Sequence, residues 1–334
     1  MEKYIKQAIQ KVASDIFLTS GSVPTIRVDG RLNKIDEDEL KHEDIKDYFW
    51  KQLNKDQKEA FKQEKDLDIR HQVDGTSMRV NIHQQTDGVG AALRIFPEEI
   101  MTPDEIQLEN VIRQTTNLPH GLVLVTGPAG SGKSTTITSL LEEVNKQKSK
   151  HIITIEDPVE MVFEDKESII EQRNVNIDTP SFHHGLKFAL RQDPDIIFLG
   201  EMRDKESVSA ALTAAETGHL VFSTLHTPTA ADTVERIIDL FPGEKKRQIL
   251  VQLSSVLKMV VSQRLLPRKE GGRVAAREIL INNSAVANLI SNNEINQINS
   301  VIQTNRDIGM KTMERAIKEL KDNDIIEDQK HTLT

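Results

Sequence analysis

The pattern of apolar and polar positions changes near residue 100, and the two parts of the chain predict different kinds of domain. An amphipathic segment occupies 1–12, and a heavily charged helical pattern follows at 41–65. The other apolar runs before residue 97 are short and strand-like, and Asp-Gly pairs separate several of them, as in hairpins. This mixture predicts a small α+β domain over 1–97.

A stretch between two prolines, PEEIMTP, follows this part, and we place a linker at 98–105. After it, apolar runs alternate with helical patterns, an order typical of a parallel sheet with helices between its strands. The chain reads as mostly helical after residue 243, interrupted by 266–272 and a strand at 274–281. We predict an α/β domain over 106–334 with a helical C-terminal region at about 283–334. Its predicted parallel strands are 122–126, 152–156, 196–200 and 220–225.

Composition narrows the class of protein. The chain has 334 residues, of which 37% are hydrophobic and 28% charged, which is typical of a soluble globular protein with two domains. Its net charge of −9 opposes a surface that coats nucleic acid, so we do not expect a nucleic-acid partner. The absence of cysteine excludes disulfides and thiolate-bound zinc. No run of 18 apolar residues occurs, so we expect a cytoplasmic protein that meets the membrane only through partners.

The stretch 127–135, GPAGSGKST, fits the phosphate-loop pattern GxxxxGK[ST] at every fixed position. An apolar run precedes it and a helical pattern follows, which is the strand–loop–helix context of the motif. Its glycines let backbone N–H groups converge on phosphate oxygens at a helix N-terminus, whereas an accidental glycine-rich turn would lack this context. We expect Lys133 to reach the β- and γ-phosphates and Ser134 to bind Mg²⁺. The predicted nucleotide-binding residues are Gly127, Pro128, Ala129, Gly130, Ser131, Gly132, Lys133, Ser134 and Thr135.

Two apolar runs end in clusters of acidic residues, IITIEDPVE and DIIFLGEMRD. The carboxyl ends of parallel strands face the ligand crevice, so these acids should converge on the phosphate loop. A triphosphate site needs an acid for Mg²⁺ and a group that orients the attacking water. Either cluster alone would also fit ordinary solvated acids at a strand end. The first cluster contains Glu156, Asp157 and Glu160, and the second contains Glu201 and Asp204.

Two histidines and two arginines are further candidates. His226 ends the strand at 220–225 on the expected phosphate edge, where an imidazole can respond to the γ-phosphate. His219 begins the same strand and fits a structural role equally well. Arg79 and Arg94 lie on strands of the first domain, and their sequence context alone favours solvated faces or salt bridges over catalysis.

Four motifs in order, GPAGSGKST, IEDPVE, ALRQDPDIIFLGEMRD and ALTAAETGHLVFSTLHT, resemble the secretion ATPase superfamily in its type II secretion and type IV pilus branch. Within that branch the chain is most similar to the PilT-like pilus retraction ATPases. The similarity extends to RVNIHQQTDGVGAALRIFP before these motifs and GGRVAAREIL after them. It implies a PAS-like N-terminal domain, a RecA-like P-loop ATPase domain, assembly as a homo-hexamer, and ATP and Mg²⁺ as cofactors.

The resemblance also implies roles for single residues. Glu160 matches the catalytic glutamate that polarises the attacking water, and Glu201 matches the glutamate associated with Mg²⁺. His226 matches the histidine near the nucleotide, with His219 accompanying it. Arg79 and Arg94 match arginines that reach a nucleotide at the subunit boundary, which raises them to candidates for catalysis.

Members of the family that drive assembly or secretion usually carry an extra N-terminal domain and a four-cysteine zinc site, and this chain shows neither. One segment departs from the retraction pattern: 285–292 reads AVANLISN where AIRNLIRE is typical. We expect a hexameric motor that hydrolyses ATP and powers pilus retraction and twitching motility. Its expected partner is an inner-membrane pilus platform protein, through which it would act indirectly on the pilin machinery.

Other functions remain open on the sequence alone. The chain could be a motor for pilus assembly, type II secretion or DNA uptake, or a nucleotide-sensing regulatory subunit that hydrolyses little ATP. Nucleic-acid translocation is a more distant alternative, which the acidic composition disfavours.

Overall fold

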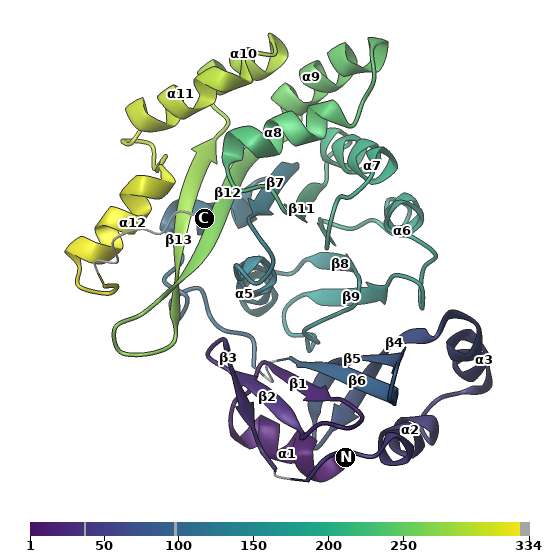
Figure 1. The fold of residues 1–334 in the computed structure, drawn as a ribbon. Helices are drawn as coiled ribbons and strands as arrows, with labels where there is room; N and C mark the ends of the chain where they lie inside the picture. Colours follow the sequence, from purple (N-terminus) through teal and green to yellow (C-terminus); the bar gives the residue numbers. More distant parts are fainter. Residues whose placement is uncertain (37, 97–98, 328–334) are drawn as a thin grey trace. The chain divides into compact units, whose positions relative to one another are not determined.

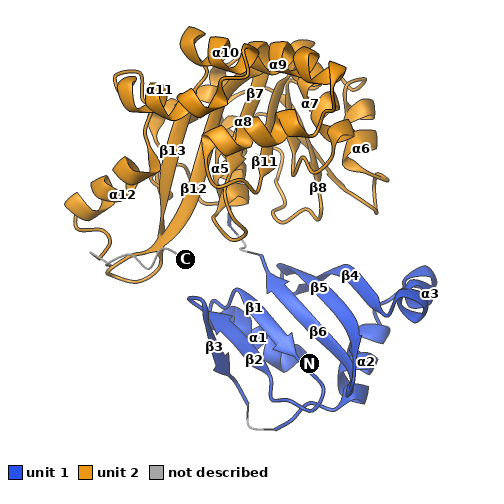
Figure 2. Cartoon of the chain, turned by 45° about the horizontal axis from the view of Figure 1, so that its top comes forward, with its two compact units in different colours: residues 1–99 blue, residues 100–334 orange. Residues whose placement is uncertain are grey.

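The computed structural model of this protein describes residues 1–36, 38–96 and 99–327 of the chain. The chain forms two compact units, 1–99 and 100–334 (Figure 2), each with its own sheet. Residue 98 of the predicted linker and residues 328–334 of the predicted C-terminal region lie outside the described residues.

The first unit is built on a six-stranded antiparallel sheet, with strand order β3-β2-β1-β6-β5-β4. The Asp-Gly pairs at 29–30 and 74–75 join β2 to β3 and β4 to β5, and both residues of each pair have positive φ, as tight hairpin turns require. The elements are α1 (Glu2–Gln10), β1 (Asp15–Leu18), β2 (Thr25–Val28), β3 (Arg31–Lys34), α2 (His42–Trp50), α3 (Lys55–Glu64), β4 (Asp66–Val73), β5 (Thr76–Gln85) and β6 (Gly88–Ile95).

The three helices of this unit share one hydrophobic core with a single face of the sheet. In β5 the buried side chains of Met78 and Val80 alternate with the partly exposed side chains of Arg79 and Asn81, because successive residues of a strand point to opposite faces. The opposite face of the sheet therefore carries the polar side chains, including Arg79.

The second unit contains a seven-stranded sheet in the order β13-β12-β7-β11-β10-β8-β9 (Figure 1). All its strand pairs are parallel except β12–β13, which confirms the predicted α/β class with a parallel sheet. Its elements are α4 (Asn110–Arg113), η1 (Gln114–Asn117), β7 (Gly121–Thr126), α5 (Lys133–Gln147), β8 (His151–Glu156), β9 (Ile169–Asn174), α6 (Phe182–Ala189), β10 (Ile196–Leu199), α7 (Lys205–Glu216), β11 (Leu220–Leu225), α8 (Ala230–Asp239), α9 (Glu244–Val256), β12 (Leu257–Pro267), β13 (Arg273–Ile281), α10 (Ser284–Ser291), η2 (Ile295–Gln297), α11 (Ile298–Thr304) and α12 (Met313–Asp322).

Both faces of this sheet are buried, which explains why its strands read as continuous apolar runs. In β7, Leu122 and Leu124 join the core formed with α6 to α11, whereas Val123 and Val125 join the core formed with α5. A strand covered on both faces has no polar side to interrupt its apolar sequence.

The prediction that the chain is mostly helical after residue 243 is wrong for 257–265, which belongs with the start of the predicted interruption at 266–272 to one segment, Leu257–Pro267. This segment forms β12, an 11-residue strand that pairs with β7 on one side and with β13 on the other (Figure 1). Its run LKMVVSQRLLP follows α9 with no turn signal between them, so a continuous helix fits the local sequence equally well. Pairing with β7, more than 130 positions earlier, makes it a strand.

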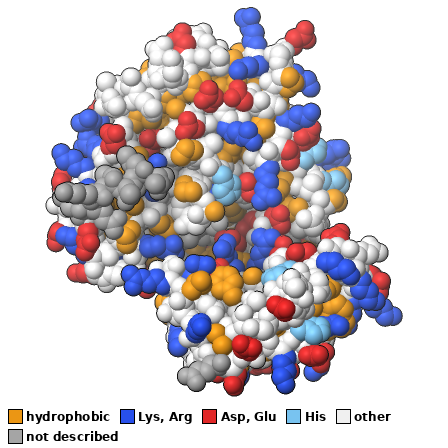
Figure 3. Space-filling model, in the orientation of Figure 1, with side chains coloured by type: hydrophobic (Ala, Val, Ile, Leu, Met, Phe, Trp, Pro, Cys, Tyr) orange, Lys and Arg blue, Asp and Glu red, His pale blue; other side chains and the backbone are white. Residues whose placement is uncertain are grey.

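Two further features concern membrane-spanning helices and the charge of the surface. Within the described ranges, no helix combines the length and the apolar character needed to cross a membrane. On the face drawn in Figure 3, side chains of Lys and Arg are interspersed with those of Asp and Glu.

Candidate active site

The phosphate loop joins β7 to α5 in a conformation that depends on its glycines. Gly127, Gly130 and Gly132 have φ of 141°, 74° and 85°, which strain any residue with a side chain. A Cβ atom on Gly127 would also lie 2.3 Å from the carbonyl oxygen of Gln263. α5 begins at Lys133, so the unpaired N–H groups of its first turn add positive potential next to the loop. The segment has the geometry of an anion cradle.

Lys133 is held over this loop. Its Nζ donates hydrogen bonds to the carbonyl oxygens of Gly127 at 2.8 Å and Pro128 at 3.0 Å, and the residue is only 8% exposed. Burial lowers the pKa of the Lys133 ammonium, and the charges of Glu201 and Glu160 act in the opposite direction. The electrostatic fields of both predicted acids therefore reach the lysine.

The sheet brings most of the predicted site residues to one edge. β7, β11, β10 and β8 are neighbours and run parallel, and their register aligns Thr126 with Leu225 and Ile155 with Leu199. Neighbouring strands lie about 4.8 Å apart, so the residues that end or follow the strands gather at the carboxyl ends of these strands. These residues are Gly127, Glu156, Glu201 and His226.

Glu201 lies between the side chains of His226 and Arg203. Its Oε1 is 3.4 Å from His226 Nε2, and its Oε2 is 2.8 Å from Arg203 Nε. The contact with His226 joins two residues that sequence reasoning assigned to different motifs. A change in the charge around Glu201 will therefore act directly on the His226 ring.

The side chain of Glu156 is buried and does not face solvent. Thr154 Oγ1 donates a hydrogen bond of 2.6 Å to Glu156 Oε1, and Gln172 Nε2 lies 3.5 Å from the same oxygen. Burial, the largest cause, raises the pKa of the Glu156 carboxyl to about 7; the nearby charge of Glu160 acts in the same direction, and the two hydrogen bonds act against it. Glu160 is half-buried in the turn after β8, and Asp157 in the same turn is exposed.

The raised pKa of Glu156 predicts a pH-dependent stability. The folded protein holds this proton up to about pH 7 and the unfolded chain only to about pH 4.5, so stability falls as pH rises between these values. The loss is on the order of 3 kcal/mol. The Glu156→Gln variant cannot ionise at this position. The thermal midpoint of this variant should therefore rise relative to that of the wild type as the pH is raised from 5 to 8. Glu164→Gln, at an exposed acid nearby, is the control, and a parallel gain there would contradict the assignment.

Within this chain His219 does not reach the phosphate loop. Its carbonyl oxygen accepts a hydrogen bond from Gly121 N–H at the start of β7, whereas the loop follows the other end of that strand. Six strand residues at about 3.3 Å each separate the two ends by roughly 20 Å. The His219 ring lies 3.1 Å from the carbonyl oxygen of Ala214 at the end of α7.

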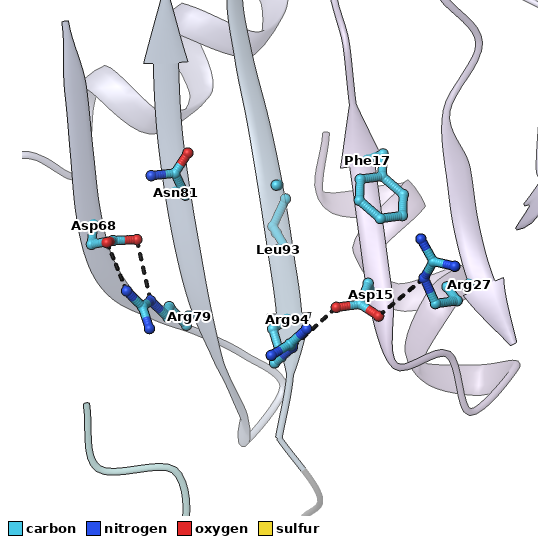
Figure 4. A pocket seen from close by; sticks show the side chains of 9 residues that line it. Asp15, Phe17, Arg27, Asp68, Arg79, Asn81, Leu93 and Arg94 are labelled. Carbon is cyan, nitrogen blue, oxygen red and sulfur yellow. Dashed lines mark hydrogen bonds and ion pairs between the residues drawn. The ribbon is translucent and has the colours of Figure 1, made fainter. Parts of the chain in front are cut away.

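Arg79 and Arg94 lie on the polar face of the first unit's sheet, where they line a hollow of about 460 Å³ (Figure 4). Arg79 forms two hydrogen bonds with Asp68, at 2.8 and 3.2 Å. Arg94 Nε is 3.1 Å from Asp15, whose other carboxylate oxygen is 3.5 Å from Arg27. Both arginines are thus in ion pairs, as the sequence context indicated.

The second unit also has the oxygen donors that Mg²⁺ prefers. Ser134 stands in the first turn of α5 with a partly exposed side chain, and Glu201 follows β10 at the same edge of the sheet. Among the described residues no three His, Asp or Glu side chains gather into a metal cage. A nucleotide-bound Mg²⁺ needs no such cage, because phosphate and water supply most of its ligands. The donor set fits such an ion.

Sequence reasoning missed two buried polar residues next to the loop, Gln263 and Arg277, each 2% exposed. They occupy neighbouring positions on β12 and β13. The signal that could have found them is a polar residue inside an apolar strand, but the segment of Gln263 had been read as helix.

A parallel sheet, a phosphate loop after β7 and acids at the ends of β8 and β10 define the chain as a P-loop ATPase. A family model described as "Type II/IV secretion system protein" matches residues 1–324, and the chain belongs to this family.

Relatives and solved structures agree with this assignment. The chain is 45% identical to "Type IV pilus retractation ATPase PilT" of Pseudomonas aeruginosa, over 92% of this chain and 90% of the relative. It is 43% identical to "Twitching motility protein" of Neisseria gonorrhoeae, over 92% and 84%. The structure titled "Crystal Structure of the Pilus Retraction Motor PilT and Bound ADP" matches with a TM-score of 0.89 and 44% identity, covering 98% of this chain and 94% of that one. The resemblance stated from the motifs is confirmed.

Proposed function

We propose that this chain is the ATP-hydrolysing motor of type IV pilus retraction and thereby supports twitching motility. The observation that carries the proposal is 45% identity to a pilus retraction ATPase over nearly the whole of both chains. The phosphate loop and the acids at the same edge of the sheet supply the hydrolytic chemistry that such a motor needs.

Different residues of the second unit have different roles in ATP hydrolysis. The N–H groups of the loop bind the phosphates of ATP, and Lys133 adds its charge at the β- and γ-phosphates. Ser134 and Glu201 would hold Mg²⁺, which would supply neutralising charge for the phosphate oxygens. Glu160 orients and polarises the attacking water. His226, in contact with Glu201, responds to the γ-phosphate.

The motor is proposed to work as a homo-hexamer in which Arg79 and Arg94 reach a nucleotide at the subunit boundary. Cationic side chains that arrive from another element or subunit stabilise the charge of phosphoryl transfer. Both arginines lie on the polar face of their sheet and pair with carboxylates, so a polyphosphate would have to replace those partners. We place the hexamer in the cytoplasm, where it acts on a membrane-embedded pilus platform protein and through it on the pilin machinery.

A second candidate function, a motor for pilus assembly or secretion, is favoured by one feature of α10. Val286 and Ile290 of this helix are buried, so the apolar part of the retraction-type segment is kept. Ala287 and Ser291 stand where the family typically has arginine, and the exposed Asn292 stands where it has glutamate. The charged face of this helix is therefore absent.

Surface pili in cells that lack the protein distinguish the two functions. Loss of a retraction motor should leave more surface pili and abolish surface motility, because pili extend but are not withdrawn. Loss of an assembly motor should leave fewer pili. The wild-type gene should restore both properties, and Glu160→Gln should restore neither. Full restoration by Arg79→Ala and by Arg94→Ala would remove both arginines from the proposed site.

A further inference from the structure

The amide side chain of Gln263 bridges the phosphate loop and the helix that follows it. β12 pairs with β7 up to Ser262 and Thr126, so Gln263 is the next residue along, level with the start of the loop. Its Nε2 donates a 2.6 Å hydrogen bond to the carbonyl oxygen of Ser131, and its Oε1 accepts a 2.9 Å hydrogen bond from Thr136 Oγ1. One side chain thus contacts both the loop and the first turn of α5.

The loop is also packed closely around this residue. A Cβ atom on Gly132 would lie 2.9 Å from Gln263 Nε2, and one on Gly127 would lie 2.3 Å from the Gln263 carbonyl oxygen. Two glycines of the motif are therefore needed for contact with β12, in addition to their role in binding phosphate.

Arg277, opposite Gln263 on β13, fixes the orientation of the amide. Its Nε donates to Gln263 Oε1 at 3.2 Å, so the amide oxygen faces the guanidinium and the amide nitrogen faces the loop. A buried guanidinium is costly unless its N–H groups are paired. Here the remaining groups donate to the carbonyl oxygens of Ile106 and Gln107 and to the carboxylate of Glu109, at 3.0 to 3.1 Å.

The contact with Ser131 has a direct consequence for phosphate binding. The peptide bond is planar and trans, so the carbonyl of Ser131 and the N–H of Gly132 point in opposite directions. Because Gln263 holds this carbonyl by its amide nitrogen, the N–H of Gly132 points away from the Gln263 side chain. A phosphate loop needs that direction, because its N–H groups must converge on the ligand.

We propose that Gln263 is a positioning residue for the phosphate loop, and that Arg277 fixes it and ties the loop to the segment 106–109. This inference rests on the proposed role of the loop in nucleotide binding. The guanidinium of Arg277 contacts both Gln263, which holds the loop, and the segment 106–109, which follows the predicted linker. Glu109 extends the network to Lys311 at 3.4 Å, close to the start of α12. One connected set of contacts, buried at Gln263 and Arg277 and partly exposed at Glu109 and Lys311, therefore joins the loop, the beginning of the second unit and its C-terminal part.

Gln263→Glu tests the proposal, because it keeps the size of the side chain and the oxygen that Thr136 and Arg277 contact. It replaces the donor to Ser131 with an oxygen, which repels that carbonyl. We expect the Kd for Mg·ADP, measured by calorimetry, and the KM for ATP each to rise about tenfold, with kcat changed less than about twofold. Gln303→Glu, at an exposed position of α11, makes the same change of charge and should leave all three constants unchanged.

The thermal midpoint separates positioning from a purely structural role. If Gln263→Glu lowers the midpoint but leaves Kd and KM unchanged, the residue is structural and the proposal is wrong. If Gln263→Glu does not fold, Arg277→Lys decides: it keeps the charge but loses the fork of donors, so Kd should rise about threefold. An unchanged Kd in Arg277→Lys would then overturn the proposal.

Lys133→Ala distinguishes this inference from the proposed site itself. If Lys133→Ala loses Mg·ADP binding while Gln263→Glu retains it, only the positioning role fails. If Lys133→Ala also binds Mg·ADP as the wild type does, the loop is not the nucleotide site, and both fail.

Discussion

Lys133→Ala should reduce ATP turnover to background and weaken nucleotide binding about a hundredfold or more. The ammonium is buried over the loop, where the carbonyl oxygens of Gly127 and Pro128 fix it at the place expected for the β- and γ-phosphates. A preorganised cation in a poorly solvated site contributes far more than one in water, and losing one such group commonly costs a factor of 10² to 10³. Phosphate release and Mg·ADP titration measure the two effects.

Lys146→Ala is the matched control for this substitution. Lys146 lies on the same helix, its side chain is 46% exposed, and its Nζ is 3.3 Å from the carboxylate of Glu142. Glu142 is buried but also pairs with Lys166, so it keeps a cationic partner when Lys146 is removed, and turnover and binding should remain near those of the wild type. Intact hydrolysis in Lys133→Ala would show that the phosphate loop is not the catalytic site.

Glu160→Gln should bind ATP with nearly the affinity of the wild type and hydrolyse it about a thousandfold more slowly. The amide keeps the size of the side chain but cannot polarise water as a carboxylate does, and a positioned general base commonly contributes a factor of 10² to 10⁴. The charge of Glu160 acts on both Lys133 and Glu156, so this carboxylate lies near the phosphate loop and the end of β8. Single-turnover hydrolysis and equilibrium binding of ATP give the two quantities.

Glu164→Gln, four residues further along the same segment, controls for the loss of one negative charge and should behave as the wild type.

The comparison of turnover in the wild type and in Glu160→Gln also decides between a motor and a regulatory subunit. Wild-type turnover no faster than that of Glu160→Gln would favour a protein that senses nucleotide and hydrolyses little. Turnover in Glu160→Gln close to a fast wild type would instead remove Glu160 from the role of base.

The two substitutions act on different parts of one composite site. Lys133 and the loop belong to the β7–α5 connection, whereas Glu160, Glu201 and His226 come from three other strand ends. The contact of Lys133 with the loop carbonyls is local, whereas the contact of Glu201 with His226 joins the ends of two strands, and the order of strands brings both to the same end of the sheet.

The sequence by itself determined the class of fold, the phosphate loop and the acids. These features are readable because each is encoded within a few neighbouring residues. The runs of β7 and β11 are apolar throughout, since both faces of those strands are buried. The GxxxxGK[ST] spacing similarly reflects a local requirement for positive φ and for a helix that begins at Lys133.

Only the tertiary structure decided the rest. Leu257–Pro267 is a strand because it pairs with β7, and this pairing joins residues more than 130 positions apart. The same pairing places Gln263 under the loop and Arg277 beside it, and it cannot be inferred from local periodicity. Glu156 reads as one more strand-end acid until the structure buries its carboxyl beside Thr154, and His219 reads as a partner of His226 until the strand between them separates the two. A local pattern specifies which element a segment can form, whereas its neighbours across the sheet determine which side chains meet.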